Sequence, residues 1–150
     1  MAVKRAMSER HASEREQGTW NQLVALHAQV SELVERALQD RFGLSLTEYS
    51  ALEALAEAPG PAGLRMQALA EAIGLNQSSV SRLVARLERQ GLAERSLNER
   101  DRRGVFTSIT ETGRETLKEA TPVYLQTLAA AFDRVGADPV LRELIERIIQ

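Results

Sequence analysis

One helical face in the middle of the chain carries side chains suited to recognising another molecule. Residues 76–89 predict a helix, because apolar side chains recur at the i, i+3, i+4, i+7 spacing of a buried face. These apolar side chains are Val80, Leu83, Val84 and Leu87. The opposite face offers amides and hydroxyls near the start of the helix and guanidiniums further along, and such groups bond base edges or phosphates. Its members are Gln77, Ser78, Ser79, Ser81, Arg82 and Arg86.

The residue types on this face differ in what they can recognise. Glutamine can bond adenine through two hydrogen bonds, and arginine can do the same with guanine. We therefore expect Gln77, Ser79 and Arg82 to contact bases. Arg86 stands one turn further on and is expected to reach a phosphate instead. Arg89 lies at the far end of the helix beside Glu88, where we expect an ordinary surface charge.

A second concentration of charge lies in a polar loop, residues 98–104. Extended segments at 92–95 and 105–109 predict a β-hairpin around this loop. The loop contains three arginines and one aspartate, and Asp101 can neutralise only part of the positive charge. Neighbouring guanidiniums repel one another unless anions lie nearby, so a phosphate backbone is the expected partner. The arginines are Arg100, Arg102 and Arg103.

A preceding helix and a short turn position the polar face. Residues 69–73 predict this helix, Gly74 can adopt the left-handed conformation that ends it, and Asn76 is suited to cap the next one. Two helices joined by a turn and followed by a basic hairpin form the outline of a winged helix-turn-helix. In that arrangement the second helix enters the major groove of DNA, and the wing touches the backbone or the minor groove.

Three stretches carry a more specific signal: LSLTEYSALEAL, LAEAIGLNQSSVSRLVARLERQGLAER and DRRGVFTSITETGR. Together they resemble the MarR family of bacterial transcriptional regulators. Asp101 and Arg103 match the family's D-x-R in the wing, and Thr110, Gly113 and Arg114 match its T-x-x-G-R. The resemblance implies that Arg103 contacts DNA and that Asp101 supports it. It also implies a homodimer formed by the terminal helices, repression at an inverted-repeat operator, and release by small aromatic or phenolic anions, as in many relatives.

The whole chain, residues 1–150, is expected to form a single, mainly α domain with a small β-hairpin wing. The DNA-binding lobe is expected at 45–110, and the dimerisation helices at 13–42 and 111–150. Residues 1–12 have few apolar anchors, so we expect a mobile tail there.

Three local signals refine this outline. Ser45 and Glu48 form a capping box ahead of a helix that starts near residue 46. Residues 64–66 are expected to add a very short strand to the sheet of the wing. Pro122 lies inside a long helical pattern and predicts a kink or a short break near residues 120–121.

The candidate effector site is less well specified than the DNA-binding face. Four aromatic or imidazole side chains could line a pocket for a small aromatic ligand. A lone histidine on an apolar stripe is more often a core or interface residue than a ligand group, so the alternative of a purely structural role stays open. The candidates are Trp20, His27, Tyr49 and Phe132.

The charge is unevenly distributed along the chain. The formal net charge is −2, yet residues 76–114 contain 8 arginines against 5 acidic residues. The rest of the chain contains 11 basic and 16 acidic residues. A basic patch on an acidic body confines phosphate attraction to one face, as a site-specific DNA-binding protein requires.

Several function classes are disfavoured. The chain has no cysteine and only 2 histidines, so we expect no disulfide, thiol switch, metal site or cofactor. No nucleophile with a neighbouring base is suggested by spacing, so an enzyme is not expected. No apolar segment could span a bilayer and the first residues are polar, which predicts a cytoplasmic protein. The remaining alternative is a winged helix used for protein–protein contact, but its exposed face should then be apolar or acidic.

Overall fold

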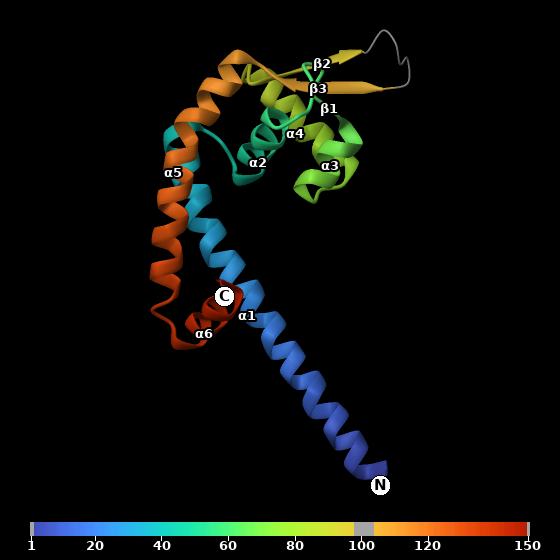
Figure 1. Cartoon of the computed structure of the whole chain (residues 1–150), viewed down its shortest axis with the longest axis vertical. Helices are drawn as coiled ribbons and strands as arrows, with labels where there is room; N and C mark the ends of the chain where they lie inside the picture. Colours follow the sequence, from blue (N-terminus) through green and yellow to red (C-terminus); the bar gives the residue numbers. More distant parts are fainter. Residues whose placement is uncertain (1, 98–103, 150) are drawn as a thin grey trace. The chain divides into compact units, whose positions relative to one another are not determined.

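The computed structural model describes residues 2–97 and 104–149, and within them the fold is mainly helical with a small antiparallel sheet, as predicted. Figure 1 shows the order of the elements. The chain divides into two compact units, Met1–Val34 with Gln126–Gln150, and Glu35–Leu125. The elements are α1 (Ala2–Phe42), α2 (Leu46–Ala56), β1 (Leu64–Arg65), α3 (Met66–Ile73), α4 (Gln77–Arg89), β2 (Ala93–Leu97), β3 (Val105–Ile109), α5 (Glu111–Val135) and α6 (Pro139–Ile149).

The first helix is longer than the sequence suggested. α1 begins at Ala2, so the prediction of a mobile tail over residues 1–12 is wrong for the residues that the structure describes. The physical reason is that residues 2–12 contain neither glycine nor proline. Adding such residues to a helix that has already nucleated requires only elongation, which is far cheaper than nucleation. α1 ends where Gly43 adopts a φ of 64° and its N–H donates to the Gln39 carbonyl at 3.0 Å.

The capping box before α2 is confirmed. The Ser45 hydroxyl accepts from the Glu48 N–H at 3.0 Å, and the Ser45 N–H donates to Glu48 Oε2 at 2.9 Å. These two bonds satisfy backbone donors that a helix start leaves without partners. Tyr49, Leu52 and Leu55 then form a fully buried row along α2. The N-terminus of α2 is therefore fixed within the unit Glu35–Leu125.

The helix-turn-helix also forms as predicted. Gly74 ends α3 with a φ of 69°, and the Asn76 side chain caps α4 by accepting from the Ser79 N–H at 2.9 Å. The predicted apolar row of α4 is buried, with exposed fractions of 1% or less. Burying this row directs the opposite face of α4 outward. The buried side chains are Val80, Leu83, Val84 and Leu87.

The wing is a three-stranded antiparallel sheet in the order β1-β3-β2 (Figure 1). The predicted short strand exists as Leu64–Arg65, and Leu64 pairs with Thr107. Gly63 has a φ of 83°, and a Cβ atom there would collide with the backbone of Thr107 and Ser108. Only glycine therefore lets the chain enter β1 so close to β3.

The short break expected near residues 120–121 does not occur, while the kink near Pro122 stays a prediction. α5 is continuous from Glu111 to Val135 with Pro122 inside it. Proline removes one helical hydrogen bond, and the helix continues on both sides of it. In addition, the Thr121 hydroxyl donates to the Leu117 carbonyl at 2.8 Å.

The unit formed by Met1–Val34 and Gln126–Gln150 has its own apolar core and an exposed apolar surface. Leu26 and Val30 are buried on α1, and Leu141 and Ile145 are buried on α6. Within residues 2–97 and 104–149, no helix combines the length and the apolar character that crossing a bilayer requires. The exposed apolar side chains of the unit include Trp20, Leu23, Val24, Val140, Ile148 and Ile149.

Candidate DNA-binding surface

The first turns of α4 present most of the predicted recognition residues to solvent. Gln77, Ser78, Ser81 and Arg82 are exposed, and Ser79 is half-buried. Gln77 and Ser81 are four residues apart, as are Ser78 and Arg82, so they form two adjacent ridges on one helix face. The arrangement gives an exposed row of amide, hydroxyl and guanidinium groups.

The cap of α4 limits what two of these serines can offer. Asn76 Oδ1 accepts from the Ser79 N–H and also from the Ser78 hydroxyl, at 2.8 Å for the hydroxyl. The Ser78 proton is thus directed at Asn76, which leaves its oxygen as an acceptor toward any ligand. Gln77 and Arg82 are the residues of this face with the greatest capacity to donate hydrogen bonds outward.

Arg86 has a structural partner that the sequence did not reveal. Its Nε donates to Glu48 Oε1 at 2.9 Å, while the other carboxylate oxygen of Glu48 accepts from the Ser45 N–H. Glu48 is 5% exposed, whereas the Arg86 side chain is 46% exposed. One carboxylate therefore both caps α2 and anchors α4. The phosphate contact predicted for Arg86 stays a prediction beside this observed ion pair.

The far end of α4 is tied to the sheet by a second ion pair. Arg95 on β2 donates through Nε to Glu88 Oε2 at 2.8 Å, and its backbone N–H donates to Glu88 Oε1 at 3.2 Å. The hydrogen bond from Arg95 lowers the pKa of Glu88 below its usual value, and the same bond raises the pKa of Arg95. Arg89 is exposed, which is compatible with the ordinary surface charge expected there.

A basic residue that the sequence reasoning did not select lies at the base of the wing. The Arg65 guanidinium carbon lies 5.2 Å from the centroid of the Phe106 ring, the residue with which Arg65 is paired across β1 and β3. Arg65 also lines a hollow of about 280 Å³ together with Gln77 and Gly104. In the sequence, the only hint of this contact is an arginine in the expected strand 64–66. The contact itself could not be predicted, because the aromatic partner lies far along the chain.

The predicted contacts at the tip of the wing, Arg102 and Arg103 with the supporting Asp101, lie outside the described residues, as does Arg100. Strands β2 and β3, which precede and follow this segment in the sequence, lie side by side in Figure 1. Their register pairs Ala93 with Ile109 and Leu97 with Val105.

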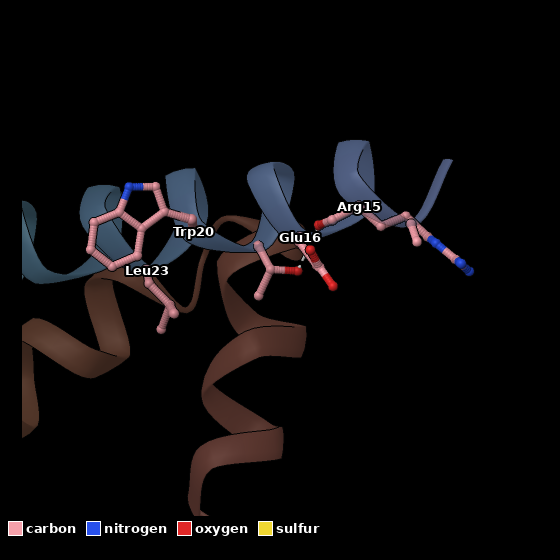
Figure 2. Close-up of a pocket in the computed structure, with 6 residues that line it drawn as sticks. Arg15, Glu16, Trp20 and Leu23 are labelled. Atoms are coloured by element: carbon pink, nitrogen blue, oxygen red, sulfur yellow. Dashed lines mark hydrogen bonds between the residues drawn. The ribbon is translucent and has the colours of Figure 1, made fainter. Parts of the chain in front are cut away.

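The candidate effector residues occupy very different environments. Trp20 is 64% exposed and lines an open pocket on α1 with Arg15 and Leu23, among others. Figure 2 shows these side chains on one stretch of α1, with the Arg15 guanidinium pointing away from the Trp20 ring. Neither His27 nor Phe132 lines this pocket. His27 is exposed on α1, with its Nε2 at 3.4 Å from the Ser31 hydroxyl.

Tyr49 is part of a closed core instead. Its ring stacks on Tyr124 with centroids 4.4 Å apart, its hydroxyl donates to Thr121 Oγ1 at 3.2 Å, and only 1% of the residue is exposed. Burial raises the pKa of the Tyr49 phenol, although the bond to Thr121 acts in the opposite direction. A ligand could contact Tyr49 only if this stack opened.

Comparisons with known proteins agree with this geometry. Residues 42–104 match the model of the MarR family. AbsC, a MarR family transcriptional regulator from Streptomyces coelicolor, is 31% identical over 89% of each chain, with a TM-score of 0.72. A second MarR family regulator from the same organism, solved in complex with DNA, is 30% identical over 91% of this chain and 86% of its own, with a TM-score of 0.74. CouR from Rhodococcus jostii, solved with bound p-coumaroyl-CoA, is 29% identical over 84% of this chain and 85% of its own, with a TM-score of 0.62.

Proposed function

Because the chain belongs to the MarR family of transcriptional regulators, we propose that it acts as a homodimer on an approximately inverted-repeat operator. As a family member it is a DNA-binding regulator and not an enzyme. The observation that carries the proposal is the exposed polar row of α4, whose opposite face is wholly buried. In a dimer, two such helices would enter successive major grooves about 34 Å apart.

The roles on this surface follow from side-chain chemistry. Gln77, Ser79 and Arg82 would contact bases, while Ser78 and Ser81 would bond bases or phosphates. Arg86, Arg102 and Arg103 would contact the backbone or the minor groove, with Asp101 holding Arg103 in place. Residues 45–110 would form the DNA-binding lobe of each subunit.

The dimer would be built by residues 13–42 and 111–150. In support, Trp20 and Val24 on α1 are 64% and 48% exposed, and Ile148 and Ile149 on α6 are 59% and 72% exposed. Large apolar side chains gathered on two helices of one unit favour a partner surface over water. Sedimentation or light scattering is expected to give twice the mass of one chain, 16.6 kDa. A monomer at micromolar concentration would contradict this part of the proposal.

The proposed regulation is repression by occupancy of a promoter in the cytoplasm, relieved by a small aromatic or phenolic ligand. Release requires that the ligand bind the DNA-incompetent state more tightly than the DNA-competent one. Trp20, His27, Tyr49 and Phe132 are the proposed contacts. A series of aromatic acids is expected to include one that raises the melting temperature and weakens operator binding. If none does either, the ligand-release proposal fails.

The decisive experiment is selection of bound duplexes from a random DNA pool, followed by titration of the selected duplex at several salt concentrations. We expect an inverted repeat bound at least a thousandfold more tightly than scrambled DNA, at the lower end of what specific regulators achieve. Failure to enrich any sequence, with only weak binding that vanishes at moderate salt, would overturn specific DNA binding. It would favour the alternative of a winged helix that contacts a protein.

A further inference from the structure

We propose that Arg65 is an additional contact to a DNA phosphate, held in position at the base of the wing beside the first residue of α4. This inference rests on the proposed DNA-binding function and adds to it a residue outside the recognition helix and outside the tip of the wing. Three features of the structure carry it: the backbone position of Arg65, the way its guanidinium is held, and the elements on either side of it.

The side chain of Arg65 does not cap the helix that follows. Arg65 is the N-cap residue of α3, and its side chain makes no capping hydrogen bond. Residues that can accept a hydrogen bond from the helix start are preferred at this position, and an arginine can only donate. The arginine therefore does not serve the start of α3.

The guanidinium of Arg65 is instead fixed against the sheet. It lies over the Phe106 ring, with 5.2 Å between its Cζ and the ring centroid. On Gly104, a Cβ atom would lie 3.4 Å from Cζ and Nη1 of Arg65 and 3.3 Å from the Phe106 ring. The guanidinium and the ring thus both lie close to the position that a side chain at residue 104 would occupy. An arginine that is already held in place loses less conformational freedom when it binds an anion.

The surroundings of Arg65 indicate which anion it would meet. The hollow that Arg65 lines also includes Gln67 on α3, Gln77 at the start of α4, and Gly104 with Val105 at the start of β3. If α4 enters the major groove and the wing follows the backbone, one DNA strand must pass between these two elements. Arg65 lies at that junction, and a guanidinium binds phosphate oxygens through two parallel hydrogen bonds.

The test measures how the binding constant for the selected operator varies with salt concentration. Arg65→Gln removes one charge, so we expect the slope of log K against log salt to become smaller in magnitude by about 0.9. We also expect about tenfold weaker binding at low salt, with the same preferred sequence. Arg65→Lys keeps the charge and is expected to keep the slope. Arg89→Gln, which removes an exposed arginine that we expect to be an ordinary surface charge, is the matched control and is expected to change nothing.

Phe106→Leu separates the phosphate contact from a packing role. It removes the ring and keeps the charge, so it is expected to weaken binding while leaving the salt slope as in the unmodified protein. A wild-type slope for a folded Arg65→Gln variant would overturn the inference while leaving DNA binding intact. The inference would also be overturned if Arg65→Lys lost as much slope as Arg65→Gln. Failure of the unmodified protein to select any duplex would instead refute the proposed function.

Discussion

Replacing Arg86 with alanine is expected to destabilise the unit Glu35–Leu125, in addition to any effect on DNA binding. The substitution removes the donor that satisfies Glu48 Oε1 at 2.9 Å. Glu48 is 5% exposed, so water cannot easily take the place of the guanidinium. The Glu48 carboxylate would retain its bond from the Ser45 N–H and lose the cationic partner that Arg86 provides.

The expected magnitude lies between two limits. Removing one partner of a fully buried ion pair costs about 3–5 kcal/mol. An exposed pair contributes about 0–1 kcal/mol. Here one partner is buried and the other, Arg86, is 46% exposed. We therefore expect Arg86→Ala to lower the free energy of unfolding by about 2 kcal/mol, and the pair to have a coupling energy of about 1 kcal/mol.

The assay is a double-mutant cycle followed by urea unfolding. The cycle compares the unmodified protein, Glu48→Gln, Arg86→Ala and the double variant, all at one protein concentration because dimer formation would be linked to folding. Arg82→Ala is the matched control, since Arg82 is exposed and lies one turn earlier on the same helix. We expect it to change stability by less than about 0.5 kcal/mol.

Two results would refute this reasoning about the ion pair. The first is a coupling energy within about 0.3 kcal/mol of zero, because independent sites are additive to that degree. The second is a loss of stability in Arg82→Ala equal to that in Arg86→Ala. Either result would mean that the contact between Arg86 and Glu48 contributes no more than an ordinary surface charge.

Three further outcomes are expected. Gly63→Ala should lower the free energy of unfolding by more than about 2 kcal/mol, because its Cβ would meet the Thr107 carbonyl, whereas Gly60→Ala has open space and should be nearly neutral in urea unfolding. Because the pKa of Tyr49 is raised in the folded protein, the neutral phenol stabilises the fold fully below the pKa of the unfolded chain, near 10, and this contribution to the free energy of unfolding is lost as pH rises through the pKa of the folded protein. An absorbance titration in which the Tyr49 phenol ionises at or below the ordinary pKa would contradict this. Gln77→Ala should alter the preferred operator sequence in a repeat of the duplex selection and leave the salt slope unchanged; an unchanged sequence would remove Gln77 from the base contacts.

The helix-turn-helix was predictable because its determinants are local. The apolar row of α4 follows the period of a helix, Asn76 caps a helix three residues before the N–H that it binds, and Gly74 needs only its own backbone freedom to end α3. The short strand at 64–65 could also be anticipated, because a hairpin with one free edge offers a place for it. The features of the helix-turn-helix depend on residues close together in the chain, whereas the short strand forms by pairing with β3, which lies far along the chain.

The first residues of α1 show where local reasoning about order fails. Few apolar anchors within residues 2–12 suggested a tail without structure, because such a segment buries little surface. These residues do not have to start a helix of their own. They extend a helix that has already nucleated, and extension costs far less free energy than nucleation. Residues of ordinary helix propensity then extend it as far as Ala2 without needing a core of their own.

The arginines of the surface could not be assigned from the sequence because their partners are distant in the chain. Arg86 pairs with a residue 38 positions earlier, and the ring beneath Arg65 is 41 positions later. In the sequence, Arg82 and Arg86 both look like DNA contacts on one basic face. The structure separates them by the burial of Glu48, which only the packing of α2 against the rest of the lobe determines.

This separation changes how a DNA-binding defect of Arg86 variants must be interpreted. Loss of binding in Arg86→Ala could follow from a lost phosphate contact or from a shifted α4, and affinity alone does not distinguish them. Glu48→Gln keeps the charge of Arg86 but weakens its anchor. If Arg86 acts only by orienting α4, Glu48→Gln should weaken operator binding as Arg86→Ala does, and both should keep the salt slope of the unmodified protein. If Arg86 contacts a phosphate, Arg86→Ala alone should reduce the magnitude of that slope, by about 0.9.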